Sequence, residues 1–283
     1  MYDLMIVGSG PAGISAALTA KARNINFIWF GSRSLSTKVE KAEKIMNYPG
    51  LIAVTGRQMQ EIFLKQIDEA GIEITEKKVD SIYDMGGYYA AGANGDIYEA
   101  KTVLMTTGMA STKEIDGESR LLGCGVSYCA TCDGGLYKDK EIAVVCTNAK
   151  YEEEVEYLAD IASKVYLFTT YKDAGVDRPN VVKYFGMPKS VLGETRVEAV
   201  EYKEEKIPVS GVFFLKDSIN PGVLLSGLEI KDGHIVVNRE QETNLSGCYA
   251  AGDCTGTPYQ YTKAVGEGNV AVHSILKYIK ENK

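Results

Sequence analysis

Short apolar runs alternate with segments of helical spacing at the start of the chain. Residues 3–7 and 26–30 are apolar enough for buried parallel strands, and residues 14–23 carry apolar side chains at helical intervals. A glycine-rich turn at 8–13 follows the first of these strands directly. Strand, glycine turn, helix and strand in this order predict a Rossmann-like unit that binds a dinucleotide.

Three glycines in that turn have separate roles in such a motif. Gly8 permits the tight turn, Gly10 lets the backbone approach a pyrophosphate, and Gly13 lets the helix pack closely on the strand. The helix N-terminus then offers free N–H groups to the phosphates. The second strand ends at Phe30 without the Asp or Glu that binds the ribose of NAD, which argues against NAD here but not against FAD. A glycine-rich turn without a ligand is the other interpretation.

The middle of the chain repeats this pattern without its ligand chemistry. Strands are predicted at 141–146 and 165–168, with a helix at 151–163 between them. The first turn holds no glycine, and the helix begins with three glutamates at 152–154, which suit the helix dipole but would repel a pyrophosphate. The turn at 169–171 has no Arg for a 2′-phosphate.

The C-terminal part of the chain is expected to complete the first unit. A β-meander is predicted at 84–100, with a hairpin turn at Asn94-Gly95. A strand at 247–251 runs into Gly-Asp, and a helix is expected from about 269 to 279.

These elements predict an α/β protein with two Rossmann-like three-layer nucleotide-binding domains. The first domain is discontinuous and comprises residues 1–108 and 214–283. A smaller second domain, residues 109–213, is inserted into it and carries the cysteine motif described below. The length of 283 residues fits about two domains.

Composition excludes several functional classes. The net charge of −7 and the absence of a basic block argue against nucleic-acid binding. No apolar run reaches ~18 residues, so no membrane span is expected. The first residues lack the features of a signal peptide, and we expect a cytoplasmic protein. The two histidines, His234 and His273, are too far apart in sequence to suggest a histidine-rich metal site.

Two cysteines, Cys129 and Cys132, form the strongest chemical motif. A C-x-x-C beside a strand–helix–strand pattern predicts a dithiol/disulfide couple. Two intervening residues bring both sulfurs within bonding reach on a helical turn, and a helix N-terminus lowers a thiol pKa. The adjacent Asp133 could relay a proton to the leaving thiol.

A metal or iron–sulfur site is the alternative interpretation of these cysteines. Cys124, Cys129 and Cys132 have the C-x₄-C-x₂-C spacing of plant-type iron–sulfur loops. The nearest fourth ligand, Cys146, ends an apparent core strand, which is a poor place for a ligand, so we favour the redox pair and no metal. The cysteines outside the pair are expected to be buried small side chains: Cys124, Cys146, Cys248 and Cys254.

Taken together, the motifs resemble those of the low-molecular-weight thioredoxin reductases over nearly the whole chain. The shared pieces are the glycine turn at 8–13, Asn-Tyr-Pro-Gly at 47–50, Cys-Ala-Thr-Cys-Asp-Gly at 129–134 and Ala-Ala-Gly-Asp at 250–253. The resemblance implies an FAD enzyme that acts on thioredoxin, usually as a homodimer.

The resemblance also implies a role for individual residues. Cys129 would attack the disulfide of the partner, Cys132 would exchange electrons with the flavin, and Asp133 would act as the acid. The residues implied to bind FAD are Gly8, Gly10, Pro11, Ala12, Gly13, Asn47, Thr107, Gly108, Gly252, Asp253, Gln260 and Tyr261.

Departures from the family point to a different electron donor. NADPH-dependent members carry a glycine-rich loop, a His-Arg-Arg run and a Gly-Gly-Gln stretch where this chain has other residues at 146–148, 169–171 and 34–38. This combination resembles the ferredoxin-dependent flavin thioredoxin reductases, which take electrons from reduced ferredoxin; flavodoxin is an equivalent donor. The family's domain rotation implies hinges near 108–112 and 208–213.

Two further expectations concern the flavin domain. Ferredoxins are acidic, so a basic docking patch is expected, and Lys38, Lys41 and Lys44 recur at helical spacing; a solvated helix face is the other interpretation. Tyr259 or Tyr261 could cover the flavin face that a nicotinamide would use. The functions that remain open are a dithiol oxidase that uses O₂, a redox sensor or electron-transfer protein, and an NADPH-dependent enzyme with an unusual pocket.

Overall fold

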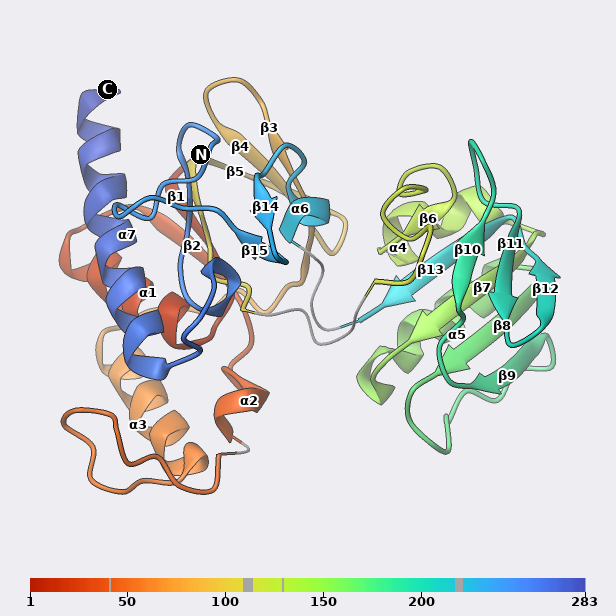
Figure 1. The fold of residues 1–283 in the computed structure, drawn as a ribbon, viewed down its shortest axis with the longest axis horizontal. Helices are drawn as coiled ribbons and strands as arrows, with labels where there is room; N and C mark the ends of the chain where they lie inside the picture. Colours follow the sequence, from red (N-terminus) through yellow and green to blue (C-terminus); the bar gives the residue numbers. More distant parts are fainter. Residues whose placement is uncertain (41, 109–113, 129, 217–220, 283) are drawn as a thin grey trace. The chain divides into compact units, whose positions relative to one another are not determined.

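The chain folds into two compact units, which we describe separately (Figure 1). One unit comprises Met1–Met109 with Pro221–Lys283, and the other comprises Ala110–Asn220. The computed structural model describes residues 1–40, 42–108, 114–128, 130–216 and 221–282, without the side chains of Thr37, Lys38 and Cys132.

A mixed sheet forms the centre of the first unit. Its strands follow the order β2-β1-β5-β4-β3, and β16 also pairs with β5. The strands are β1 (Tyr2–Val7), β2 (Phe27–Phe30), β3 (Val79–Asp84), β4 (Tyr89–Ala93), β5 (Asp96–Met105) and β16 (Cys248–Ala250). β1, β2, β5 and β16 run parallel, so their carboxyl ends lie at one edge of the sheet. The first half of β5 pairs antiparallel with β4 instead.

The predicted hairpin of this unit is confirmed. Asn94 and Gly95 have φ angles of 50° and 83°, as a two-residue turn with left-handed backbone requires. Strand β5 continues beyond the predicted meander as far as Met105.

Two helices, α1 and α7, lie side by side against this sheet (Figure 1). The hydroxyl of Ser15 donates to the Val265 carbonyl at 2.7 Å and joins them. The other elements of this unit lie around them. Besides the strands of the sheet, the unit contains α1 (Pro11–Ala22), α2 (Thr37–Glu40), α3 (Gly56–Glu69), α6 (Pro221–Leu224), β14 (Ile230–Lys231), β15 (His234–Ile235), η3 (Asp253–Thr255) and α7 (Tyr261–Glu281).

Helix α7 begins at Tyr261, well before the expected start near residue 269. Gly266 and Gly268, which precede the expected start, both lie inside α7. A Cβ on Gly268 would come within 2.2 Å of the Ala12 carbonyl oxygen. This glycine therefore serves the close approach of α1 and α7 rather than the start of a helix.

The second unit is built on a five-stranded sheet in the order β6-β13-β7-β8-β9, with every pair parallel. Helices cover one face, and a second, antiparallel sheet β10-β11-β12 packs on the other through Tyr202, whose ring lies 5.2 Å from that of Phe168. The elements are β6 (Val126–Ser127), α4 (Ala130–Asp133), η1 (Gly134–Tyr137), β7 (Glu141–Cys146), η2 (Ala149–Tyr151), α5 (Glu152–Ile161), β8 (Lys164–Thr169), β9 (Val181–Phe185), β10 (Ser190–Leu192), β11 (Ala199–Tyr202), β12 (Glu205–Pro208) and β13 (Gly211–Leu215).

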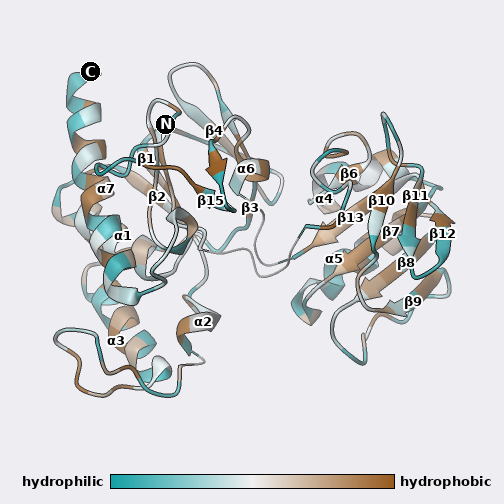
Figure 2. Cartoon of the chain, in the orientation of Figure 1, coloured by the Kyte–Doolittle hydropathy of each residue, from teal (hydrophilic) through white to brown (hydrophobic). Residues whose placement is uncertain are grey.

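The parallel strands β7, β8 and β13 of the second unit are strongly hydrophobic (Figure 2). The expected α/β class and its Rossmann-like strand–helix–strand units are confirmed. The expected domain boundary at residue 213 falls inside β13, whose five residues are all buried in the second unit. Residues 211–213 of the expected hinge at 208–213 belong to the same strand. No helix within the described part of the chain is both long and apolar enough to cross a membrane.

Candidate functional site

The carboxyl edge of the first sheet brings together residues from distant parts of the sequence. Gly8 follows β1, Thr107 and Gly108 follow β5, and Gly252 and Asp253 follow β16. Ligands of open α/β sheets bind at this edge, beside the strand where the chain order reverses. Here that strand is β1, which has β2 on one side and β5 on the other.

The turn after β1 has no room for a side chain at Gly8 or at Gly13. Gly8 has φ +119°, and a Cβ there would lie 2.3 Å from the Thr106 carbonyl oxygen. A Cβ on Gly13 would lie 2.0 Å from the Gly8 carbonyl oxygen. The Trp29 indole N–H and the Thr106 hydroxyl both donate to that Gly8 carbonyl, at 2.8 and 3.0 Å. The turn is therefore held rigidly against the ends of β1, β2 and β5.

The N-terminus of α1 is open and uncapped. Gly10 occupies the N-cap position, and a Cβ placed there would meet no atom within 4 Å. No side chain in the described part of the chain caps this end, Pro11 has no N–H to offer, and the first turn carries no acidic residue. The amides of Ala12 and Gly13 thus point, with the positive end of the helix dipole, into a space that suits an anion.

The loop after β16 is held by one ion pair of α7. Glu267 accepts from the Gly252 amide at 2.8 Å and from the Thr255 hydroxyl at 3.0 Å. Lys263 donates to the carbonyls of Gly252 and Gly256, both at 2.9 Å, and pairs with Glu267 at 3.1 Å. This Lys263–Glu267 pair fixes the backbone on both sides of Asp253. The sequence analysis missed it, although Lys and Glu four residues apart after Gly-Asp were a visible signal.

A buried hydroxyl lies at the end of β5. Thr107 Oγ1 is buried and has no hydrogen-bond partner among the described residues. A buried hydroxyl without a partner is uncommon, because leaving it unpaired costs about 1–3 kcal/mol. A ligand at this edge of the sheet would supply the missing partner.

Two of the expected FAD residues meet across 213 positions of sequence. Asn47 Nδ2 donates to Gln260 Oε1 at 2.9 Å, which ties the loop after α2 to the start of α7. Beside them the Tyr259 hydroxyl lies 2.7 Å from His234 Nε2, a pair that the sequence analysis did not anticipate. Tyr261 is half-buried at the start of α7 and packs on the core.

These features fit an FAD pyrophosphate. The fit rests on the open space at Gly10, the uncapped helix end and the unpaired hydroxyl of Thr107. Of the expected lysine row, Lys44 lies beyond the end of α2 at Glu40, and Lys41 and the side chain of Lys38 lie outside the described residues.

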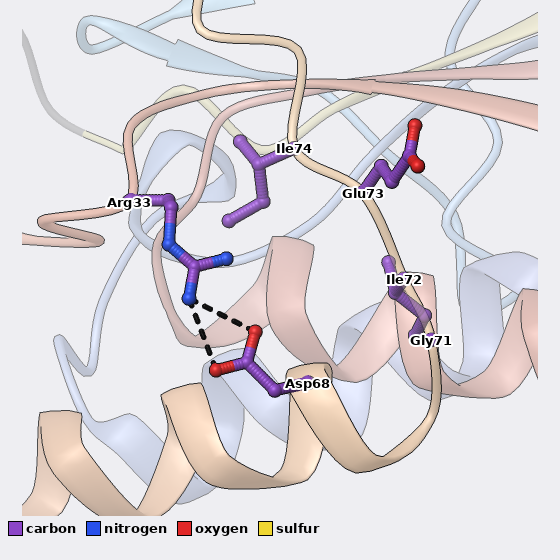
Figure 3. A pocket seen from close by; sticks show the side chains of 6 residues that line it. All are labelled: Arg33, Asp68, Gly71, Ile72, Glu73 and Ile74. Carbon is purple, nitrogen blue, oxygen red and sulfur yellow. Dashed lines mark hydrogen bonds and ion pairs between the residues drawn. The ribbon is translucent and has the colours of Figure 1, made fainter.

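A separate surface cavity of about 420 Å³ opens beside Arg33, which follows β2 (Figure 3). The Arg33 guanidinium donates to both carboxylate oxygens of Asp68, at 2.9 and 3.0 Å, across its mouth. Residues 71–74 form the rest of its lining. None of the expected FAD residues belongs to it.

The cysteine motif lies in the second unit, after β6. Cys132 belongs to α4, Cys129 lies outside the described residues, and Asp133 is half-buried where α4 meets η1. A Cβ on Gly134 would lie 3.1 Å from the Leu158 side chain, so the segment packs directly on α5. Because α4 follows the parallel strand β6, residues 130–134 lie beyond the carboxyl end of a strand of the parallel sheet.

Side chains of the second unit link the start of α5 to the loop after β8. Glu152, at the N-terminus of α5, accepts from the Gly175 amide at 3.0 and 3.1 Å and from the Tyr171 hydroxyl at 2.9 Å. The Tyr171 hydroxyl also lies 3.5 Å from Cys146 Sγ. Burial raises the pKa of the Cys146 thiol, which is 0% exposed. A carboxylate and a tyrosine thus stand where a pyrophosphate would need open amides.

Cysteine burial was predicted correctly for three of four residues. Cys146, Cys248 and Cys254 are buried, whereas Cys124 is exposed, because it lies in the turn closed by the Leu122–Val126 bridge rather than in the core. Burial raises the pKa of Cys254 to about 11 and that of Cys248 to about 12. Within the described residues no cluster of His, Cys, Asp or Glu side chains is arranged to hold a metal.

Comparisons with known proteins match the whole chain. A family model described as pyridine nucleotide-disulphide oxidoreductase matches residues 2–166 and 186–268. A thioredoxin reductase of Listeria monocytogenes is 30% identical over 304 aligned positions, which cover 100% of this chain and 95% of that protein.

Two solved structures are more similar still. A ferredoxin-flavin thioredoxin reductase from Clostridium acetobutylicum superposes with a TM-score of 0.90 at 43% identity, covering 99% of this chain and 98% of that one. A second structure of that description from the same organism gives 0.87 at 47% identity, covering 99% and 97%. A thioredoxin reductase from Gloeobacter violaceus gives 0.78 at 27% identity, covering 100% and 95%.

Proposed function

Because the chain belongs to the pyridine nucleotide-disulphide oxidoreductase family, among relatives of the bacterial thioredoxin reductases, we propose that it reduces thioredoxin with electrons from reduced ferredoxin. The family makes it a flavin-dependent disulfide oxidoreductase. FAD is the proposed flavin, Cys129 and Cys132 are the proposed redox pair, and flavodoxin is an equivalent donor.

The first unit is the proposed FAD domain. The residues 8–13 would face the pyrophosphate with backbone amides, and Asp253 would bind the ribityl or phosphate region. Gly108, Asn47, Gln260 and Tyr261 would complete the site. FAD supplies the conversion between single-electron and two-electron transfer.

The proposed reaction reduces one disulfide with two electrons and two protons. Two reduced ferredoxins give one electron each, and two protons are taken up, so that the Cys129–Cys132 disulfide becomes two thiols. Cys129 then attacks the thioredoxin disulfide, forming a mixed disulfide, and Cys132 displaces the reduced thioredoxin. Asp133, next to Cys132 in sequence, is the proposed proton donor and acceptor for the thiols.

One observation carries the choice of donor. In NADPH-dependent relatives the turn after β7 must receive a pyrophosphate, and here Glu152 bonds Gly175 and Tyr171 at that place. The negative carboxylate at the helix N-terminus opposes a second anion there. The proposed donor is also energetically sufficient, because a ferredoxin near −400 mV and a thioredoxin near −270 mV differ by roughly 130 mV, or about 6 kcal/mol for two electrons.

A reconstituted reduction assay tests the function as a whole. The FAD-loaded protein is mixed anaerobically with reduced ferredoxin and oxidised thioredoxin, and thioredoxin thiols are counted. We expect turnover in the native chain and none in Cys129→Ser or Cys132→Ser. Thiol production that persists in Cys129→Ser would contradict the proposed route, and rapid peroxide formation from a dithiol in air would favour an oxidase. The proposed homodimer is checked by sedimentation.

A further inference from the structure

A carboxylate with no exposure to solvent lies at the centre of the second unit. Glu118 is 0% exposed and forms an ion pair with Lys216, which is 1% exposed. The Tyr128 hydroxyl donates to Glu118 Oε1 at 2.6 Å, and the Ile115 amide donates to its other oxygen at 3.1 Å. Glu118, Tyr128 and Lys216 together are called the Glu118 network below.

The network joins three segments that matter for the proposed chemistry. Tyr128 directly precedes Cys129, the first cysteine of the motif. Lys216 directly follows β13 and precedes residues 217–220, through which the chain returns to the first unit. Glu118 lies near the other crossing, after residues 109–113. The network therefore joins Tyr128, the residue before the cysteine motif, to Glu118 and Lys216, which lie close in sequence to the two ends of the second unit.

Packing around the network fixes Tyr128 strongly. β6 and β13 are parallel neighbours, so the Tyr128 and Phe214 rings lie 5.9 Å apart. The Lys216 ammonium lies 5.2 Å from the centre of the Tyr128 ring and 5.4 Å from that of Phe214. Burial, with Glu118 beside it, raises the pKa of Tyr128, so its hydroxyl stays a donor.

Stability alone does not account for such a network. Taking an ion pair fully out of water costs about as much as the pair returns, and an apolar pair of the same volume is often equally stable. What a fully satisfied buried network adds is a single, rigid arrangement of the segments it joins. The segment it holds most directly here is the one that leads into Cys129.

We infer that the Glu118 network positions the Cys129–Cys132 pair and thereby stabilises its disulfide. This inference rests on the proposed dithiol function. Holding the backbone of Tyr128 limits the positions open to the next residue, which raises the effective concentration of one sulfur near the other. The disulfide is reduced to the dithiol by two electrons and two protons. Loosening the network therefore shifts this equilibrium toward the dithiol.

The test is the equilibrium between disulfide and dithiol in the full-length, FAD-loaded protein. Native protein and Tyr128→Phe are equilibrated with graded dithiothreitol buffers, and free thiols are trapped and counted by a mass-tagged maleimide. Tyr128→Phe removes the bond to Glu118 and keeps the ring. We expect its reduction constant to rise roughly threefold to tenfold, about 14 to 30 mV for a two-electron couple.

Tyr202→Phe is the matched control in the same unit. Tyr202 is buried, and its hydroxyl donates to the Phe185 carbonyl at 2.7 Å. It belongs to β11 in the antiparallel sheet β10-β11-β12, whereas the cysteine motif follows β6 of the parallel sheet. Its loss removes a comparable hydrogen bond, so the reduction constant should stay at the native value. An equal rise in Tyr202→Phe would overturn the inference, because any loosening of the unit would then suffice.

A second variant removes the charges together. Glu118→Gln with Lys216→Met replaces the ion pair by neutral side chains of similar volume, which the fold tolerates better than an unpaired buried charge. We expect a rise at least as large as in Tyr128→Phe. Native reduction constants in both variants would overturn the inference. Failure of the native protein to form a Cys129–Cys132 disulfide in any buffer would instead overturn the proposed function.

Discussion

The Gly175 backbone N–H donates to both carboxylate oxygens of Glu152, at 3.0 and 3.1 Å, and this contact joins the start of α5 to the loop after β8. The contact is close enough that a Cβ on Gly175 would lie 2.9 Å from Glu152. In a dinucleotide-binding unit these two segments would stand apart to admit the ligand. Here they are bonded directly, and the Glu152 carboxylate at the N-terminus of α5 opposes the binding of a further anion at that helix end.

Glu152→Gln should weaken this contact without creating a nucleotide site. Loss of the charge on a half-buried hydrogen-bonded group lowers the free energy of unfolding by about 1–2 kcal/mol. NADPH affinity should stay undetectable, because the turn still lacks glycines and an Arg for the 2′-phosphate. Chemical denaturation and equilibrium dialysis with NADPH measure the two effects. Tight NADPH binding by the variant would show that Glu152 alone blocks the site.

Gly10→Ala and Gly13→Ala should separate cofactor binding from folding. The added methyl at Gly10 meets no protein atom, so the apoprotein should unfold within about 1 kcal/mol of the native value while FAD affinity falls at least tenfold. The methyl at Gly13 would press on the Gly8 carbonyl and should cost about 3 kcal/mol. FAD affinity is read from quenching of Trp29, the single tryptophan, which donates to the Gly8 carbonyl. Unchanged FAD affinity in Gly10→Ala would place the pyrophosphate elsewhere.

Thr107→Val should stabilise the apoprotein and weaken FAD binding. The substitution replaces a buried hydroxyl without a partner by a methyl of the same shape, which favours folding by about 1 kcal/mol. If the cofactor is the missing partner, FAD affinity falls threefold to tenfold by the same reasoning. Apoprotein melting and FAD titration measure both. Thr106→Val serves as the control, because the Thr106 hydroxyl already bonds the Val7 and Gly8 carbonyls and its loss should destabilise the apoprotein.

Lys263→Met and Glu267→Gln should weaken FAD binding in a coupled manner. Both residues fix the loop that contains Asp253, so each single change releases it and the double change adds little. A coupling energy of about 1 kcal/mol is expected from the four FAD dissociation constants. Lys277 and Glu281 form an exposed pair with the same spacing on the same helix, and the matching cycle there should give no coupling. Additive effects at Lys263 and Glu267 would contradict a joint role.

Buried thiols make stability fall at high pH. Cys254 has a folded-state pKa of about 11, whereas an unfolded thiol titrates near ~8.5, so between these values the unfolded state binds fewer protons. The free energy of unfolding therefore decreases as pH rises from about 9 toward 11. Cys254→Ala should reduce that slope by about 1.4 kcal/mol per pH unit. Denaturation at several pH values measures the slope, and an unchanged slope would contradict the assigned burial effect.

The same burial predicts which cysteines react. At pH 8 iodoacetamide should label exposed Cys124 rapidly and leave Cys248 and Cys254 unlabelled until the protein unfolds. Peptide mass mapping of labelled protein checks this, and rapid labelling of Cys254 in the folded protein would contradict it.

Local sequence patterns were enough to predict the strand–turn–helix at the start of the chain. Gly8 and Gly13 are dictated by neighbours within one supersecondary unit, so their roles follow from spacing. The predicted start of α7 was wrong because Gly268 is required by the close contact with Ala12, which lies far away in sequence. No local pattern reveals such a contact. The exposure of Cys124 was missed for a similar reason, since cysteine is usually buried and only the tertiary fold places this one in a surface turn.

Long-range polar contacts were beyond sequence reasoning altogether. Asn47 and Gln260 were each expected in the FAD site on family grounds, but their bond to each other is a product of the fold. The Glu118–Lys216 pair was not anticipated at all, because nothing in the local sequence of either residue indicates a charged partner inside the core. Such pairs are set by which strands become neighbours.

The central claim is that electrons enter this flavoprotein from a ferredoxin and not from a pyridine nucleotide. The most direct measurement is anaerobic bleaching of the FAD absorbance of the purified protein by reduced ferredoxin, NADPH and NADH, each added separately. We predict rapid bleaching by reduced ferredoxin, reduction of the Cys129–Cys132 disulfide with it, and no bleaching by either nucleotide. Rapid bleaching by NADPH, or a flavin that reduced ferredoxin leaves oxidised, would contradict the claim.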